Sequence, residues 1–474
     1  MADDPHVALL EWASSHGATL HPSLEIARDE HTGAGFHVKQ GARLSAGDPV
    51  VTCPMPLTLS YLNALPSPPA PFHKDPSSPT FPEAFLQSSP PHVVGRFFLM
   101  QQYLRGRESP WWPYIRSLPQ PDDPASWTLP PFWDKDDREL LEGTNLEVSI
   151  SKINATLKRE FNDAQRLLGD WEDGSKFTRP LYNWAYAVFT SRSFMPSLVV
   201  PSVHELELPR GVKSWDDFSV LLPLFDIGNH SITARTIWET EGTGCRLVTR
   251  DTYGEGEQVF NNYGMKTNAQ LLLAYGFVIP PTEELHNDYI HIRKRAAPGS
   301  EAQGQKQTEY LFSLRAMADE SSVLGKAMQE NSIPPDDMFP AFRHVQDGMV
   351  LDLAQQIVQH NPALRPRSSE EGASAEGSDD LLKQILTADL PQESSQLLNI
   401  AVATVQQKAL QELEKLDESE VEVDEEQEAE LTVFQRLAVE YRRRCREVLE
   451  GVMESIEKSV EDPRYVALMG EDTP

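Results

Sequence analysis

Residues 221–230 read LLPLFDIGNH, and residues 256–277 read GEQVFNNYGMKTNAQLLLAYGF. In the first stretch an apolar run leads directly into Asp226, Asn229 and His230. Taken alone, this pattern is also typical of a strand that ends in an Asx turn, with His230 as a satisfied core histidine. Three polar groups at the end of a buried run are nevertheless candidates for binding a ligand.

The second stretch places Tyr263 before a glycine and ends, after a helical run of leucines, at Tyr275. Tyrosine-glycine pairs often end strands, and the leucines need only be core residues. A third segment near the start of the chain, residues 32–36, reads TGAGF. Its two glycines would let a ligand approach the backbone, although such a pair more often forms only a turn.

Strand-like stretches with many turn residues occupy residues 34–60 and 220–278, on either side of a mainly helical block. This order predicts one β domain interrupted by a helical insert. Residues 6–16 form a predicted amphipathic helix, with Gly17 suited to its C-cap. Residues 62–91 are rich in proline and serine, and we expect them to form a long exposed loop that packs no core.

Helical periodicity recurs in the central block and again towards the end of the chain. It predicts helices over residues 92–105, 135–142, 149–168, 178–190, 309–328, 347–359, 381–387, 392–416 and 431–460. Residues 367–380 and the acidic residues 417–430 have low complexity, which predicts disordered linkers or loops.

The charge of the chain limits its partners. Its 42 basic and 72 acidic residues give a formal charge of −30, which repels nucleic acid and anionic lipid and favours basic partners. The first residues lack the pattern of a secretory signal, and the apolar residues 271–281 are too few to span a bilayer. We therefore expect a soluble intracellular monomer that binds neither nucleic acid nor membranes directly.

Cysteine and histidine usage argues against a structural metal. The three cysteines, Cys53, Cys245 and Cys445, are widely spaced, and no HExxH or HxxxH pair occurs. Neither a disulfide framework nor a four-cysteine zinc site is available from these residues. We expect no metal site.

Together and in this order, the motifs resemble the SET domain, specifically the class that contains the plant RuBisCO large-subunit methyltransferase and the ribosomal-protein lysine methyltransferases of fungi. The matching segments are GAGF at 33–36, VTCPMPLTLS at 51–60, WWPYIRSLP at 111–119, TSRSF at 190–194, DIGNH at 226–230 and GEQVFNNYG to LLLAYGF at 256–277. Beyond about residue 300 only the helical pattern and the domain order support the resemblance.

The resemblance implies an α+β protein in which a helical insert divides the SET β fold and an all-α substrate-binding domain follows. The implied domains are an N-terminal helix with the first part of the SET domain (1–60), a Pro-rich loop and helical insert (61–219), the second part of the SET domain with the catalytic tyrosine (220–290), and a helical substrate-binding domain with disordered acidic loops (291–474).

The resemblance also implies an activity. The protein would be an S-adenosyl-L-methionine-dependent protein-lysine N-methyltransferase that acts on a non-histone protein in the nucleus or the cytoplasm. A basic protein, and a ribosomal protein first of all, is the expected substrate, because fungal relatives act there and because the negative charge would attract it.

Site residues are implied where this sequence matches the motifs. The cofactor would contact Thr32, Gly33, Ala34, Gly35, Arg192, Asn229, His230 and Tyr263, and Tyr263 would also be the catalytic tyrosine. The target side chain would enter among Trp111, Ser193, Phe194, Met195, Asp226 and Tyr275. Thr32 replaces an acidic residue of the plant enzyme and Met195 replaces polar residues of other relatives, so these two positions bear on cofactor affinity and peptide preference.

The chemistry needs positioning rather than a metal, because the cofactor already carries an activated methyl group. A free lysine titrates near pH 10.4, so delivering its neutral amine at pH 7 costs about 4.6 kcal/mol. A narrow aromatic channel and the nearby sulfonium charge both lower the lysine pKa, and Tyr263 and Tyr275 suit such a channel. The Tyr263 hydroxyl would orient the amine. We expect Asp226 to fix the turn that presents its neighbours, and not to act as a general base.

Three other functions stay open at this point. The chain could be a SET-like module that binds a peptide without modifying it, a protein-histidine methyltransferase, or an acidic helical scaffold. Phe194 favours lysine over histidine, because the histidine-modifying branch has an amide at this place that can bond the second ring nitrogen of an imidazole. A phenyl ring offers no such bond and instead suits the aliphatic stem of lysine.

Overall fold

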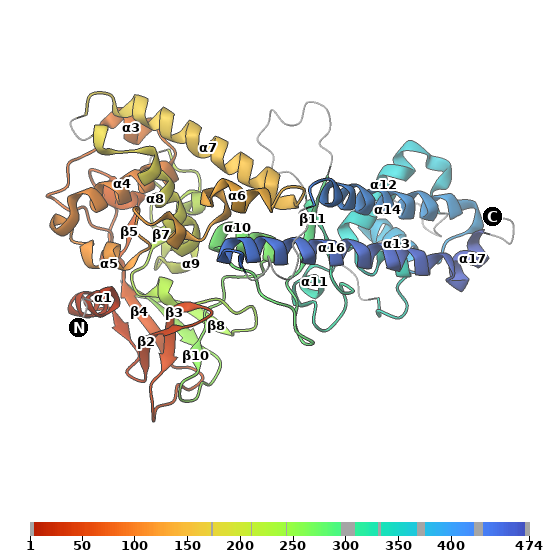
Figure 1. The fold of residues 1–474 in the computed structure, drawn as a ribbon, viewed down its shortest axis with the longest axis horizontal. Helices are drawn as coiled ribbons and strands as arrows, with labels where there is room; N and C mark the ends of the chain where they lie inside the picture. The colour runs from red at the N-terminus through yellow and green to blue at the C-terminus, as the bar shows by residue number, and fades with distance from the viewer. Residues whose placement is uncertain are drawn as a thin grey trace. The chain divides into compact units, whose positions relative to one another are not determined.

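The structure is a computed structural model that forms two compact units (Figure 1). Unit 1 consists of Met1–Phe132 and Ser151–Met265, and unit 2 consists of Trp133–Ile150 and Lys266–Pro474. The residues that the structure describes are 4–171, 174–209, 211–242, 244–294, 309–329, 333–366, 375–420 and 430–469.

The strands of unit 1 are short and antiparallel. They pair in the orders β1-β4-β9-β8, β10-β3-β2 and β5-β7-β6. Their bounds are β1 Thr19–Leu20, β2 Leu24–Asp29, β3 Gly33–Val38, β4 Pro49–Pro54, β5 Leu59–Ser60, β6 Ser193–Phe194, β7 Val220–Leu221, β8 Thr236–Glu241, β9 Gly244–Thr249 and β10 Gln258–Val259. Each sheet joins strands that precede the helical block to strands that follow most of it. The predicted β domain with a helical insert is therefore confirmed.

Helices of unit 1 pack over these sheets. In Figure 1, strands β2, β3, β4 and β10 gather at one end of the unit and helices α3, α4 and α8 at the other. The core between α4 and α8 is aromatic, and Phe97 lies 5.4 Å from Tyr182 between ring centroids. The bounds are α1 Pro5–Ser15, α2 Tyr61–Ala64, α3 Glu83–Ser88, α4 Pro91–Arg105, α5 Trp112–Ser117, α8 Arg179–Arg192 and α9 Pro196–Val199.

The Pro-rich residues 62–91 do not form the exposed loop that their composition predicts. Phe72, Phe81 and Phe85 are buried in the core of unit 1. A few aromatic side chains are enough to anchor the segment, because each removes a large apolar area from water. The prediction was wrong because it rested on the many prolines and serines of the segment and gave no weight to these three phenylalanines.

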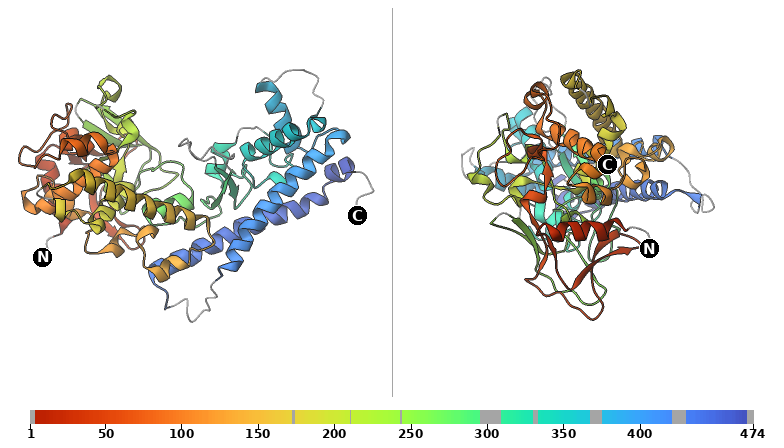
Figure 2. Two further views of the ribbon diagram at one scale, coloured as in Figure 1. Left: turned by 90° about the horizontal axis from the view of Figure 1, so that it is seen from above. Right: turned by 90° about the vertical axis from the view of Figure 1, so that its left-hand side faces the viewer.

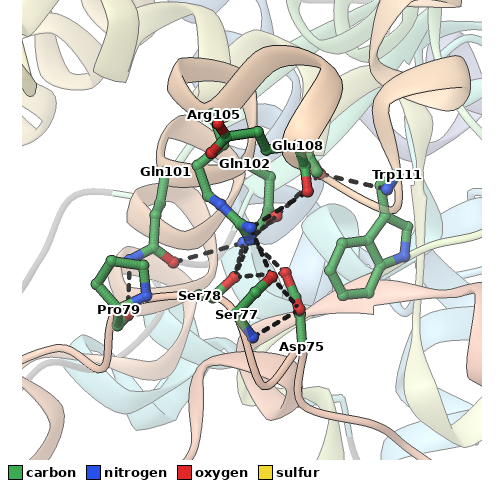
Figure 3. Close-up of polar contacts among 10 residues, drawn as sticks. Asp75, Ser77, Ser78, Pro79, Gln101, Gln102, Arg105, Glu108 and Trp111 are labelled. Carbon is green, nitrogen blue, oxygen red and sulfur yellow. Dashed lines mark hydrogen bonds and ion pairs between the residues drawn. The ribbon is translucent and has the colours of Figure 1, made fainter.

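A polar network holds the same segment against α4 (Figure 3). The guanidinium of Arg105 donates to Asp75, to Ser78 and, over 2.7 Å, to the Ser77 hydroxyl. Gln102 Nε2 donates to the Ser78 hydroxyl over 2.8 Å. The side chains of Arg105 and Asp75 are 13% and 8% exposed, so this ion pair is shielded from water. Burial opposes ionisation, but hydrogen bonds from Ser77 and Arg105 lower the pKa of Asp75 to about 2.

Unit 2 is mainly helical. Helices α14 and α16 are long and lie side by side (Figure 2). Its elements are α6 Lys135–Glu139, α10 Asn268–Tyr275, β11 Tyr289–Arg293, β12 Glu309–Ser313, α11 Val323–Met328, α12 Asp347–His360, α13 Ala375–Leu386, α14 Ser395–Glu418, α16 Val433–Val460 and α17 Pro463–Met469. The helix α7 (Asn145–Leu168) begins in unit 2 and continues in unit 1.

Local sequence explains where α16 begins. The Thr432 hydroxyl accepts from the Gln435 backbone N–H over 3.1 Å, and the Gln435 side chain accepts from the Thr432 N–H over 3.0 Å. This capping box satisfies donors that the first helical turn leaves unpaired. Buried residues then recur at helical spacing along one face, namely Ala438, Tyr441, Cys445, Val448, Leu449, Val452 and Ile456.

One predicted helix is wrong. Residues 309–328 contain β12, which pairs with β11 over the full length of both strands, and become helical only at Val323–Met328. The aromatic and aliphatic residues of EYLFS fit a strand as well as a helix, and pairing with β11 decides the outcome. The other predicted helices are present, with shifted ends.

The two low-complexity stretches lie partly outside the described residues. Residues 367–374 and 421–429 are not described, whereas residues 375–380 begin α13 and residues 417–418 end α14. The prediction of disorder is therefore wrong for those two described parts. In the described part of the chain, no helix is long and apolar enough to cross a membrane.

We predict that Arg105→Met lowers the free energy of unfolding of unit 1 by about 3 kcal/mol, because it leaves the buried Asp75 carboxylate without its cation. Urea denaturation followed by tryptophan fluorescence measures this. Arg166→Met is the control, since the Arg166–Asp163 pair is 77% and 48% exposed and should contribute under about 1 kcal/mol. Equal effects of the two changes would contradict the anchoring role.

Candidate active site

The segment after β7 turns sharply and places three site residues. Leu224 has a φ of +73°, an unusual value for a residue with a side chain, and it is fully buried. A short 3₁₀ turn, Phe225–Ile227, follows. Gly228 then passes close to β3, where an added Cβ would lie 3.3 Å from the Phe36 ring. Strain of this kind persists where the surrounding structure fixes the backbone, and it is common at functional sites.

Residues 228–231 and 261–263 form a hydrogen-bonded pair of segments that we call the clasp. The Asn261 N–H donates to the Asn229 carbonyl over 2.7 Å, and the Ser231 N–H donates to the Asn261 carbonyl over 2.9 Å. The Tyr263 N–H donates to His230 Nδ1 over 3.0 Å, and the Tyr263 hydroxyl donates to the Gly228 carbonyl over 2.8 Å. The clasp brings together the two stretches that the sequence singled out.

The rings of His230 and Tyr263 stack inside the clasp. Their centroids are 5.0 Å apart with an angle of 18° between the planes, and His230 is 8% exposed. Because His230 Nδ1 accepts a hydrogen bond, the proton of the neutral imidazole lies on Nε2. The imidazole thus sets the position of the Tyr263 backbone, and the phenol ring rests against it.

Asn229 joins the clasp to β3. Its Nδ2 donates to the Ala34 carbonyl and to Gln258 Oε1, each over 3.0 Å. An added Cβ on Gly35 would lie 2.9 Å from Asn229 Nδ2 and 3.1 Å from Gln258 Oε1, so a larger residue here would displace these two side-chain amides. Gln258 Nε2 also donates to the Thr32 hydroxyl over 2.8 Å. The structure therefore gathers Thr32, Gly33, Ala34 and Gly35 beside Asn229.

Gln258 was not among the predicted residues. It lies opposite His37 where β10 pairs with β3. It stands within the GEQVFNNYG motif, but only the pairing of β10 with β3 shows that its side chain reaches Asn229 and Thr32. At the start of β3, Gly33 has a φ of +74° and an added Cβ would meet no atom within 4 Å. The backbone there is open for a ligand to approach.

Asp226 is a buried carboxylate held by two donors. Its side chain is 2% exposed, and Oδ2 accepts from the Tyr114 hydroxyl over 3.2 Å and from Arg192 Nη1 over 3.3 Å. Burial raises the pKa of Asp226, and the charge of Arg192 opposes this. Arg192 Nη1 also donates to the Asp226 carbonyl over 3.2 Å. Asp226 thus fixes an arginine, a role that the sequence did not predict.

Three aromatic rings, from β6, from the turn after β7 and from β8, pack on one another. The Phe194 centroid is 5.1 Å from that of Trp238 and 6.3 Å from that of Phe225, and Phe225 and Trp238 are 5.5 Å apart. Sequence reasoning selected Phe194 alone. Trp238 lies on β8 and belongs to no recognised motif, so only the sheet places it here.

The structure does not bring Trp111, Ser193 and Met195 into this cluster. Trp111 is a core residue, 4% exposed, whose indole N–H donates to the Leu57 carbonyl over 3.0 Å. The Ser193 hydroxyl donates to that of Ser219 over 2.8 Å and borders a separate cavity of about 270 Å³. Met195 is 56% exposed at the start of α9. In a strand, neighbouring side chains face opposite ways, which separates Ser193 from Phe194.

Tyr275 belongs to unit 2, in α10. The Lys266 ammonium lies 5.9 Å from the centroid of its ring, and Phe277 lies 6.3 Å away between centroids. Burial raises the pKa of Tyr275 and lowers that of Lys266. The assignment of Tyr275 to the target channel stays a prediction.

Comparisons with known proteins agree with this fold. No family model matches the chain. The chain is 27% identical to "Ribosomal lysine N-methyltransferase set10" of Schizosaccharomyces pombe, over 61% of this chain and 50% of that protein. It is 23% identical to "N-lysine methyltransferase SETD6" of Bos taurus, over 68% and 71% of the two chains. The chain thus aligns with half the length of the first relative.

A solved structure, described as the SET domain of LSMT bound to lysine and AdoHcy, superposes with a TM-score of 0.60 and 16% identity, covering 96% of this chain and 91% of that one. This match shows the fold. The predicted resemblance to SET-domain lysine methyltransferases and the predicted α+β fold class are both confirmed. A weaker relative is "Actin-histidine N-methyltransferase" of Gallus gallus, 23% identical over 58% of this chain and 42% of that protein.

We predict that Gly35→Ala lowers the free energy of unfolding by about 1–2 kcal/mol and shifts the NMR signal of the Asn229 side-chain amide, because the new methyl group displaces it. Gly254→Ala is the control, since its Cβ would meet nothing nearer than 3.6 Å. An unmoved Asn229 amide in Gly35→Ala would contradict the close approach described for β3.

Proposed function

We propose that this protein is an S-adenosylmethionine-dependent protein-lysine N-methyltransferase that acts on a non-histone protein. The observation that carries the proposal is the clasp, which sets Tyr263 and His230 beside Asn229 and the open glycine backbone of β3. Relatives named as lysine methyltransferases, with SETD6 aligned over most of its length, support the same activity.

The residues present fit this cofactor. Arg192 Nη1 donates to the carbonyl and the carboxylate of Asp226. Within the described residues, its Nε and Nη2 donate to no group. Its side chain is 30% exposed, so these donors can bind the carboxylate of the cofactor's amino-acid part. Asn229, His230 and the open backbone at Gly33 would hold the rest of that part. When bound, the cofactor supplies an activated methyl group on a sulfonium.

Tyr263 can orient the attacking amine. Its hydroxyl donates to the Gly228 carbonyl over 2.8 Å, and a phenol oxygen that donates its proton can also accept a hydrogen bond from a substrate N–H. A hydrogen bond from the amine N–H to this oxygen fixes the orientation of the amine, and therefore the direction of its lone pair. In-line transfer depends on such alignment. Tyr263 therefore needs no ionisation to act.

The amine must arrive neutral, which for lysine at pH 7 costs about 4.6 kcal/mol. We propose that Phe194 and Trp238, which pack on the buried Phe225, lie along the path of the incoming chain, where an apolar surface favours the uncharged amine. Asp226 does not serve as the base in this proposal. It is buried and already binds Tyr114 and Arg192.

Histidine methylation is the second candidate, because one relative is named as an actin-histidine methyltransferase. Phe194 argues against it, since its ring packs on Trp238 and offers no hydrogen-bond partner to an imidazole. For the substrate we propose a basic ribosomal protein, on the strength of the name of the fission-yeast relative and the net charge of −30. We propose further that the enzyme works as a monomer in the nucleus or the cytoplasm, without binding nucleic acid directly.

We predict that Tyr263→Phe lowers methyl transfer to extract protein by at least about 100-fold, because the amine loses its orienting oxygen, while the Kd for S-adenosylmethionine stays nearly unchanged. Radiolabel transfer and calorimetry measure the two effects. Tyr253→Phe is the control, since Tyr253 pairs with Leu44 and lies outside the clasp. Full turnover in Tyr263→Phe would remove the tyrosine from the reaction.

We predict that the methyl group is found on lysine. Extracts from cells with and without the gene would be incubated with purified enzyme and labelled cofactor, and fragmentation mass spectrometry would locate the label. We expect label on a lysine of a ribosomal protein. We expect no labelled lysine when the Tyr263→Phe variant replaces the enzyme. Label on histidine alone would overturn the substrate class and leave the cofactor site standing.

A further inference from the structure

Tyr114 is a fully buried residue with one polar atom. It lies in α5, and its ring belongs to the core of unit 1. The hydroxyl donates to Asp226 Oδ2 over 3.2 Å, and burial beside Asp226 raises the pKa of this phenol well above its usual value. It therefore stays protonated and acts only as a donor to the carboxylate.

The Asp226 carboxylate depends on few partners. Oδ2 receives Tyr114 and Arg192, whereas Oδ1 is buried and has no hydrogen-bond partner among the described residues. Among the described residues, the buried thiol of Cys53 on β4 also faces this carboxylate. A buried carboxylate with so few donors is expensive to keep ionised. Removing one of the two donors makes its neutral form more favourable.

Arg192 takes its orientation from this carboxylate. Nη1 donates to both the side chain and the carbonyl of Asp226, and the rest of the guanidinium is directed elsewhere. A neutral Asp226 would hold the guanidinium only weakly, and a long side chain that is 30% exposed would then sample other rotamers. The edge proposed to bind a carboxylate would no longer be fixed in advance.

We infer that Tyr114 is a positioning residue for the cofactor site, which acts through Asp226 to fix the guanidinium of Arg192. This inference rests on the proposed function, because the role of Arg192 is part of it. It assigns a purpose to the tyrosine of the WWPYIRSLP segment, in which sequence reasoning selected only Trp111. The chain of contacts runs from the helical insert to the end of α8 and the turn after β7.

The test is Tyr114→Phe in the full chain, with the Kd for S-adenosylmethionine measured by calorimetry from pH 6 to pH 9. Loss of the hydroxyl raises the pKa of Asp226 further, so protonation sets in at higher pH. We expect about a tenfold rise in Kd at neutral pH, which grows as the pH falls and shrinks as it rises. The kcat at saturating cofactor should change little, so the effect falls on the KM for the cofactor.

Tyr182→Phe is the matched control. Tyr182 is equally buried, and its hydroxyl donates over 2.8 Å to Glu160, a carboxylate that Arg96 also binds over 2.7 Å. The two variants lose the same group beside the same kind of ion pair, so their thermal stabilities should fall alike. Only Tyr114→Phe should alter the Kd and its pH profile. A general loss of packing would move both.

A double-mutant cycle with Arg192→Lys separates the remaining outcomes. If Tyr114 acts through Arg192, Tyr114→Phe has no further effect on the Kd in the lysine background. Should Tyr114→Phe alone fold poorly, the pH profile of Asp226→Asn replaces it, and the inference requires a raised Kd that no longer depends on pH. If Tyr114→Phe binds the cofactor with the same Kd and the same pH profile as the wild-type protein, this inference is overturned and the proposed function still stands. A wild-type protein that binds no cofactor overturns the proposed function, and the inference with it.

Discussion

Four hydrogen bonds between residues 228–231 and 261–263 hold the candidate site together. Neither segment is a regular strand over this length, so no sheet would otherwise keep them side by side. With the clasp in place, Tyr263 rests on His230, and Asn229 reaches the carbonyl of Ala34 on β3. Three distant parts of the chain then share one small volume. Two glycines, Gly35 and Gly228, make this approach possible, because a methyl group at either would crowd a neighbour.

The helical insert is compatible with this arrangement because the sheets do not depend on chain continuity. Strand β5 precedes the insert and β6 and β7 follow most of it, yet they form one sheet. Each sheet is completed only when the chain returns, so the insert and the β strands must fold together. The insert also contributes to the site, since Tyr114 on α5 reaches Asp226. The insert is therefore a structural part of the candidate site.

The sequence indicated those parts of the site that lie in recognisable local patterns. Asn229, His230 and Tyr263 stand next to strand ends and glycines, where short motifs carry information. Gln258 and Tyr114 stand within quoted motifs and Trp238 stands in none. All three were missed because their roles arise from pairing between strands or from packing across the insert, which a motif does not show. Trp111 and Ser193 also stand within motifs, and their hydrogen bonds go to Leu57 and Ser219. Their assignment to the target channel stays a prediction, because a motif does not say which way a side chain faces. Composition likewise failed for residues 62–91, where buried phenylalanines and Arg105 outweigh the prolines.

Among the described residues of unit 1, two buried carboxylate–arginine pairs also involve a tyrosine, and the two pairs differ in their hydrogen-bond donors. Glu160 receives His92, Arg96 and Tyr182, and hydrogen bonds and charges from these partners outweigh burial and lower its pKa. Asp226 receives fewer donors, and burial raises its pKa. In a purely structural ion pair, each additional hydrogen-bond donor stabilises the ionised form of the carboxylate. A carboxylate that keeps an unpaired oxygen beside an arginine with unused donors costs stability. That cost is understandable where the arginine must stay available to a ligand, and it separates the candidate site from the purely structural pair.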